Sequence, residues 1–192
     1  MREIACDESG YEGVRLVGGV TDVFAHAGVG LAPAAAAGCV AELRRRIRSP
    51  AEEYKANHLL RGKHRDTLLW LFGPAGPVLG HAHVHLVDKT ALARSGADPD
   101  LLVPALRAVV AVWGADVVIV HDRQVALTPG RLARVPCPVR FVAASADARV
   151  QVADFLAGVA RRAASEALAG RPDPELAAVL LPYVSATSDA LL

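Results

Sequence analysis

Segments with the pattern of β-strands alternate with segments with the pattern of helices along this chain, and this alternation restricts its fold more than any other feature. The run DVVIVHD (116–122) is a short, continuous apolar segment typical of a buried strand. The run HAHVHLVDKT (81–90) contains the period-two alternation of a strand, whereas Asp147–Ala169 has helical spacing. We therefore predict a mixed α/β fold.

The order of the predicted elements follows from these patterns. Strands are expected over Arg2–Asp7, Arg15–Val20, Val23–Leu31, 81–90, 116–122 and 139–145. Helices are expected over Ala34–Arg48, Lys63–Phe72, Leu101–Trp113, Asp147–Ala169 and Pro172–Leu180. No long linker divides the 192 residues, so we expect one domain over 1–192, with a short last helix and a tail from about residue 171.

Composition restricts the core and the cellular setting. The chain is 53% hydrophobic but only 5% aromatic, so the core is expected to consist of Ala, Val and Leu. Its three cysteines, Cys6, Cys39 and Cys137, lack CxxC spacing, which argues against a disulfide framework or a zinc site. The N-terminus MREIACDESG lacks the apolar region of a signal peptide, and no apolar run is of membrane-spanning type. These features predict a cytoplasmic protein without a membrane partner.

Acidic residues stand at the ends of predicted elements or on a mainly apolar helix face. Asp7 ends the first strand, Asp122 ends VVIVHD, Asp154 lies in the long last helix, and Glu53 lies in EEYKAN. Clustered carboxylates raise one another's pKa unless a cation joins them, and Mg²⁺ prefers such oxygen ligands. Two such ions can hold the attacking and leaving oxygens of a phosphodiester. Spacing leaves a second interpretation open, in which Asp7 and Asp122 are turn residues and Asp154 is a surface acid.

Other motifs give weaker signals. His81, His83 and His85 alternate as transition-metal ligands can, but packed structural histidines are the favoured interpretation. His121 precedes Asp122 and could orient water or exchange protons, or could be an ordinary histidine. The runs RRRIR and RGKHR could attract phosphate backbones, although the net charge of +1 gives no strong overall field. No glycine run has GxGxxG or GK[ST], so neither a nicotinamide nor an ATP site is predicted.

The chain resembles a bacterial family of ribonuclease-H-like proteins of unknown function, the domain of unknown function 3800. The matching pieces lie between about residues 2 and 165: CDESG, LVGGV, EYKANHLLR, VHLVDK, VIVHD and FVAASADARVQVADFLAGVARR. The DESG motif and the QxAD motif are the most specific, and their order agrees with the family. The resemblance implies a ribonuclease-H-like mixed β-sheet flanked by helices.

The resemblance also implies a set of functional residues. Asp7, Glu53, Asp122 and Asp154 match the family's acids and would be both the catalytic residues and the ligands of Mg²⁺ or Mn²⁺. Glu52 competes with Glu53 for its role. Lys55 and Lys89 match basic positions that would contact phosphate, and Ser9 and Gln151 would support the site.

Three functions follow as hypotheses. The first is a metal-dependent phosphodiesterase or nuclease of ribonuclease-H-like type, with a nucleic acid as substrate. The second is a non-catalytic accessory module on the same fold, which binds nucleic acid or a protein, or forms a homodimer. The third and weakest is a hydrolase of small phosphorylated molecules. Loss of Mn²⁺ binding on substitution of the acids would distinguish the first hypothesis from the second, and a nucleotide panel would distinguish the third.

Overall fold

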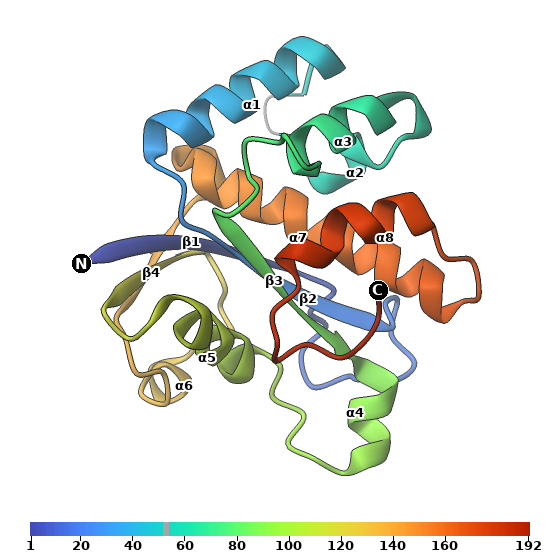
Figure 1. Cartoon of the computed structure of the whole chain (residues 1–192). Helices are drawn as coiled ribbons and strands as arrows, with labels where there is room; N and C mark the ends of the chain where they lie inside the picture. Colours follow the sequence, from blue (N-terminus) through green and yellow to red (C-terminus); the bar gives the residue numbers. More distant parts are fainter. Residues whose placement is uncertain (52–53) are drawn as a thin grey trace.

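The computed structural model describes residues 1–51 and 54–192, and in this part the chain forms a mixed five-stranded sheet flanked by helices (Figure 1). The strands are β1 (Arg2–Ser9), β2 (Val23–Val29), β3 (Ala82–Asp88), β4 (Val117–Asp122) and β5 (Val139–Val142). Their order in the sheet is β3-β2-β1-β4-β5. The β1–β2 and β2–β3 pairs are antiparallel, and the β1–β4 and β4–β5 pairs are parallel. The prediction of an α/β fold is confirmed.

Helices connect the strands and cover the sheet. They are α1 (Pro33–Ile47), α2 (Ala56–Leu59), α3 (Arg65–Phe72), α4 (Lys89–Ser95), α5 (Leu102–Trp113), α6 (Pro129–Leu132), α7 (Ala148–Leu168) and α8 (Pro174–Leu180). Short 3-10 turns lie at Gly62–His64, Ala144–Ala146 and Leu181–Tyr183. None of the described helices combines the length and the apolar character needed to cross a membrane.

The sheet separates two hydrophobic cores. Helix α7 lies across β1 and β2, with α1, α3 and α8 packed outside it, while α5 lies on the opposite face (Figure 1). Helix α7 can occupy the centre because most of its buried residues are small or apolar and because the Asp147 side chain caps its first turn. Every residue of β2 is buried, as expected for a strand covered on both faces.

Alternation along β1 determines which side chains face α7. Ala5 packs with Val150 of α7, whereas Ile4 and Cys6 pack with the α5 core. Successive side chains of a strand point to opposite faces, so Asp7 lies on the α7 face with Ala5. The prediction that Asp7 and Cys6 face in opposite directions is confirmed, and the acid therefore lies against the last long helix.

Two predictions about the elements are wrong. Residues Arg15–Val20 form a loop of bends in place of a strand, and Val17 and Val20 are exposed. The carboxylate of Glu12 accepts the backbone N–H of Val20, so this loop is closed by a side chain and not by a neighbouring strand. The predicted strand over 81–90 extends too far, since helix α4 begins at Lys89; the Asp88 carboxylate caps this helix by accepting the N–H groups of Thr90 and Ala91.

The last residues of the chain run along the outer edge of β3 (Figure 1). The backbone N–H of Ser185 donates to the Val84 carbonyl at 2.9 Å, and that of Asp189 donates to the Leu86 carbonyl at 3.0 Å. In return, the N–H of Leu86 donates to Ser188 Oγ at 3.1 Å. The segment thus satisfies backbone groups that an edge strand would otherwise present to other chains.

Candidate carboxylate site

Asp7 and Asp122 lie at the carboxyl ends of two neighbouring parallel strands. Cys6 of β1 is paired with His121 of β4, so the next residues along the two strands are Asp7 and Asp122. Neighbouring strands are about 4.8 Å apart. Each acid comes two positions after a residue, Ala5 or Val120, that packs on the α7 face, so each acid lies on that face too. The register therefore brings together two acids that are 115 positions apart in the sequence.

The charges around Asp7 repel its ionised form. Asp7 is only 6% exposed, and burial is the largest cause that raises its pKa, to about 8. The neighbouring carboxylates of Glu8, Asp154 and Asp122 raise the pKa further, while the Glu8 N–H that donates to Asp7 Oδ1 lowers it. The structure therefore brings three of the predicted acids within electrostatic reach of one another, together with Glu8.

The Asp154 side chain connects α7 to the segment that begins at residue 54. Its Oδ2 accepts the backbone N–H of Ala56, the first residue of α2, at 2.9 Å. One turn further along α7, Gly158 permits the close approach, since a Cβ there would lie 2.2 Å from the Ala56 Cβ. Lys55 directly precedes this contact and is half-buried. Glu53, and Glu52 which competes with it, lie outside the described residues.

Asp122 and Gln151 hold the turn that leads into α7. Asp122 Oδ1 accepts the Ala144 N–H at 3.0 Å, and Gln151 Nε2 donates to the Ala144 carbonyl at 3.1 Å. Gln151 is buried, and its Oε1 has no hydrogen-bond partner within residues 1–51 and 54–192. Gln151 and Asp122 thus both hold the Ala144 peptide groups, Gln151 at the carbonyl and Asp122 at the N–H.

His121 lies on the opposite face of the sheet from the acids that face α7. It is fully buried, and its Nε2 is 3.1 Å from His26 Nε2 and 3.6 Å from Glu8 Oε2. Its Nδ1 is 2.8 Å from the Asp122 carbonyl oxygen. Gln124 Nε2 donates to Glu8 Oε1 at 2.6 Å. His121 therefore contacts the acid cluster through Glu8 and through the backbone of Asp122.

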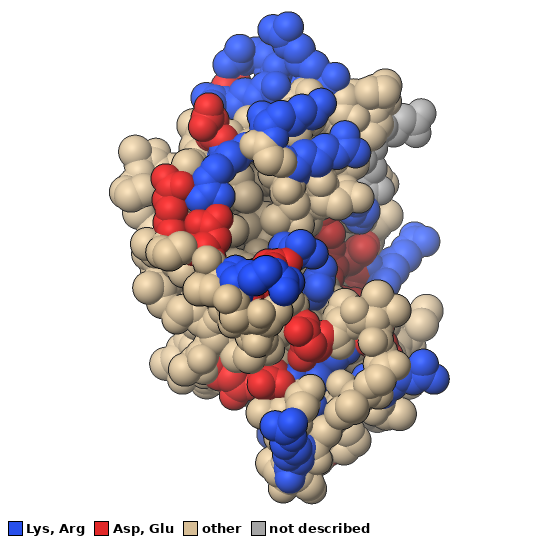
Figure 2. All heavy atoms as spheres, turned by 90° about the vertical axis from the view of Figure 1, so that its right-hand side faces the viewer, with Lys and Arg blue, Asp and Glu red and all other residues tan. Residues whose placement is uncertain are grey.

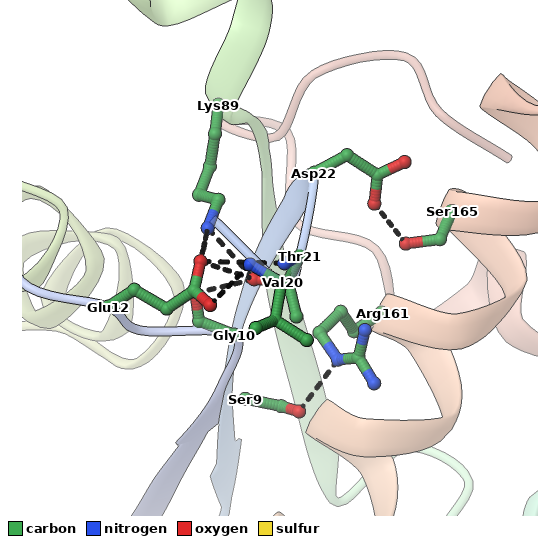
Figure 3. A network of polar contacts seen from close by, with 9 residues as sticks. All are labelled: Ser9, Gly10, Glu12, Val20, Thr21, Asp22, Lys89, Arg161 and Ser165. Atoms are coloured by element: carbon green, nitrogen blue, oxygen red, sulfur yellow. Dashed lines mark hydrogen bonds and ion pairs between the residues drawn. The ribbon is translucent and has the colours of Figure 1, made fainter. Parts of the chain in front are cut away.

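Lys89 belongs to a buried network beside the end of β1 (Figure 3). Its ammonium group is fully buried and donates to Glu12 Oε2 at 2.7 Å, Thr21 Oγ1 at 2.8 Å and the Gly10 carbonyl at 3.3 Å. The Lys89 hydrogen bond is the largest cause that lowers the pKa of Glu12, to about 2. All three ammonium donors are therefore used to hold the Gly10–Thr21 loop.

Ser9 ends β1 on the same face as Asp7, and its hydroxyl accepts a hydrogen bond from Arg161 Nε at 2.9 Å (Figure 3). Arg161 comes from α7, two helical turns after Asp154. The sequence places Arg161 on the helix face of Asp154 and in a basic pair with Arg162 that could attract phosphate backbones, but it assigns no role to Glu8. Their signals were helical spacing for Arg161 and the position next to Asp7 for Glu8.

Two of the three histidines of HAHVHL, His83 and His85, are packed within the fold, whereas His81 is exposed. Trp113 Nε1 donates to His83 Nδ1 at 2.8 Å, and His85 Nδ1 is 3.1 Å from Thr187 Oγ1. Burial is the largest cause that lowers the pKa of both imidazoles, to about 4 for His83. Both rings are therefore neutral at physiological pH and contact α5 or the C-terminal segment.

Basic side chains gather on one part of the surface. Figure 2 shows Lys and Arg side chains concentrated at the top of the molecule, the level at which α1 and α3 lie in Figure 1. The exposed basic residues of RRRIR and RGKHR lie in or next to these elements: Arg44, Arg45 and Arg46 in α1, Arg48 directly after it, and Arg61 and Lys63 in the turn that precedes α3. Glu42 forms ion pairs with Arg45 and Arg46, so part of this charge is neutralised.

Comparisons of the chain with protein-family models, with curated proteins and with solved structures find no match. Among the residues that the structure describes, no group of three or more His, Cys, Asp or Glu side chains is arranged to hold a metal ion. The chemical character of the site therefore rests on its carboxylates, on the hydrogen bonds that orient them and on the charges around them.

Proposed function

We propose that this protein is a metal-dependent phosphodiesterase, a nuclease of ribonuclease-H-like type, whose site is the carboxylate cluster at the ends of β1 and β4. The observation that carries this proposal is the position of Asp7. Its buried carboxyl lies within electrostatic reach of Glu8, Asp122 and Asp154, three groups that raise its pKa. A divalent cation would remove this repulsion, because it stabilises the ionised form of every acid around it.

The donor set suits Mg²⁺ or Mn²⁺. These hard cations prefer carboxylate oxygens, and Mg²⁺ is usually held by one or two protein carboxylates together with water and substrate phosphate. In the proposal Asp7 and Asp154 are the central ligands, Asp122 is a further ligand, and Glu53 is assigned the ligand role that the resemblance implies. A site of this kind needs no closed cage of three side chains before the substrate arrives. The bound cation would supply activation of water and charge stabilisation at the phosphate.

The protein's own residues have separate tasks in this proposal. Asp154 is oriented by the Ala56 N–H, and Asp122 by the Ala144 N–H, so two carboxylates are held before any ligand binds. Lys55 stands next to the Asp154 contact and is assigned to the substrate phosphate. Gln151 and Ser9 support the backbone and the end of β1, and His121 links Glu8 to the buried His26.

The sheet also supports a ribonuclease-H-like fold. The spatial meander β1–β2–β3 is followed by two strands parallel to β1, with helices on both faces. The first acid is on the central strand, a second on its parallel neighbour and a third on the helix that crosses both. We also place the protein in the cytoplasm, which suits its free cysteines Cys6, Cys39 and Cys137.

The proposal is tested by Mn²⁺ titration calorimetry and by cleavage assays on single-stranded and duplex DNA and RNA. We expect wild type to bind Mn²⁺, and Asp7→Asn, Asp154→Asn and Glu53→Gln each to lose most of the binding and at least about 100-fold in cleavage rate, the scale of losing electrostatic stabilisation at a reacting centre. Binding should also release protons near pH 7, because Asp7 must ionise to become a ligand. Asp66→Asn is the matched control, since Asp66 is exposed on α3.

Other outcomes have definite meanings. Full cleavage by Asp7→Asn would exclude the proposed site. Nucleic-acid binding with neither cleavage nor Mn²⁺ affinity would make the protein an accessory module. Turnover of mononucleotides but not of polymers would make it a hydrolase of small phosphorylated molecules.

A further inference from the structure

Arg161 is held in a fixed position at the end of β1. Its Nε donates to Ser9 Oγ at 2.9 Å, the one dashed line that Figure 3 draws from this residue. Its side chain extends from α7 on the helix face that also carries Asp154 and Gly158. The guanidinium therefore belongs to the same end of the sheet as the acids.

Gly10 provides the surface on which the arginine stem rests. A Cβ at Gly10 would lie 2.9 Å from Arg161 Cδ and 2.3 Å from the Val23 carbonyl oxygen. Gly10 also has φ +87°, a backbone conformation that favours glycine. The stem is thus packed at one end and the Nε is hydrogen-bonded at the other, so little side-chain entropy remains to be lost when a ligand binds.

The outer nitrogens of Arg161 are available to a ligand. Within residues 1–51 and 54–192, Arg161 forms no ion pair, and its hydrogen bond to Ser9 uses Nε alone. The two acids whose charges act on the Arg161 guanidinium have partners of their own, since Glu12 binds Lys89 and Asp22 accepts a hydrogen bond from Ser165. Burial is the largest cause that lowers the pKa of the guanidinium. A half-buried cation with unused N–H donors is suited to an external anion.

We propose that Arg161 and Ser9 form a binding site for a phosphate group adjacent to the one that is cleaved, an inference that rests on the proposed function. Ser9 is two residues beyond Asp7, about 6.6 Å along the strand. Arg161 is seven residues beyond Asp154, about 10 Å along the helix. A phosphate bound to the two outer nitrogens of Arg161 would therefore lie next to the acid cluster and not within it. The substrate must then carry at least two phosphates, as an oligonucleotide strand does.

The test separates this site from catalysis by omitting the metal. In EDTA, fluorescence anisotropy measures binding of a labelled single-stranded octanucleotide to the full chain. We expect Arg161→Gln to weaken binding about 10- to 100-fold, the scale of a charge-assisted bidentate contact, and to reduce the salt slope by about one phosphate. Arg161→Lys should keep the charge but lose the fork, with an intermediate affinity.

Arg162→Gln is the matched control, because Arg162 is the next residue, is exposed and pairs with Glu166. An equal loss in both variants, or no loss in Arg161→Gln, overturns the inference. Chemical unfolding of each variant identifies a loss that comes from misfolding, and in that case Arg161→Lys decides the result. If wild type cleaves nothing with Mn²⁺ but Arg161→Gln alone loses oligonucleotide affinity, the phosphate site stands and the nuclease proposal fails.

Discussion

Asp7 is a protonated acid at neutral pH in the metal-free protein, because its pKa is about 8. An unfolded chain has its Asp pKa near ~3.9, so the folded state binds the proton more tightly than the unfolded state does. The stability that comes from this proton is complete below about pH 4 and is lost as the pH rises through about 8. A residue that would bind metal thus makes the metal-free protein less stable at alkaline pH.

The substitution Asp7→Asn should remove this dependence. We expect the variant to be more stable than wild type by ~1–3 kcal/mol at pH 8.5, the usual scale for a buried polar group without full compensation. The difference should shrink toward pH 5, where Asp7 is protonated in the folded protein. Urea unfolding at several pH values without metal measures both. A parallel fall in stability for Asp7→Asn and wild type between pH 5 and 8.5 would contradict the assignment.

At the scale of elements, the contact between α2 and α7 determines the geometry around Asp154. Ala56 donates its N–H to Asp154, and Gly158 leaves the space that Ala56 fills. A four-residue helix such as α2 has little stability of its own, so it depends on this packing. The same contact fixes Lys55, which the proposed function assigns to the substrate.

The substitution Gly158→Ala tests this contact. We expect a loss of ~1–3 kcal/mol in unfolding free energy, because the new methyl group overlaps the Ala56 Cβ. Gly38→Ala in α1 is the control, since nothing lies within 4 Å of a Cβ there, and it should gain ~0.5–1 kcal/mol. Thermal unfolding compares the two. Equal gains in both variants would show that α2 does not pack against α7 at Gly158.

At the scale of the whole molecule, the chain protects one edge of its sheet with its own C-terminal segment. Val184–Leu192 follows α8 back across the fold and pairs with β3, while the Tyr183 hydroxyl donates to the Phe72 carbonyl at 2.9 Å. The opposite edge is the short strand β5, which has four residues. Short edge strands and covered edges both limit pairing between molecules.

Deletion of residues 184–192 should expose β3. We expect a loss of ~2–4 kcal/mol in stability, from several backbone hydrogen bonds at ~0.5–1.5 kcal/mol each, and concentration-dependent association through the freed edge. Size-exclusion chromatography with light scattering, together with urea unfolding, measures both effects. Ser188→Ala removes the hydroxyl that contacts the Leu86 N–H, the Val84 carbonyl and Ser185 Oγ but leaves the backbone hydrogen bonds to β3, and it should remain monodisperse if wild type is. A monodisperse deletion variant of unchanged stability would show that the segment does not protect the edge.

The sequence by itself determined the classes of element and the direction of the first acid. Period-two alternation places Asp7 opposite Cys6, and the seven-residue spacing of Asp154 and Arg161 places both on one face of a helix. These are local properties, because a strand repeats every two residues and a helix every 3.6 residues. The loop that replaces the predicted strand Arg15–Val20 shows the limit of such patterns, since Glu12 closes it through a side chain.

Only the tertiary structure decided which residues meet. The β1–β4 register makes Asp7 and Asp122 neighbours, and Gly158 lets α2 approach Asp154. Nothing in the sequence around Lys89 indicates that it is buried, yet its ammonium group is fully buried and donates to Glu12, Thr21 and Gly10. Pairing register and burial depend on contacts between segments far apart in the chain, and no local periodicity encodes these contacts. For this reason the sequence named the acids, and the fold gave Asp7 its raised pKa and Arg161 its open guanidinium.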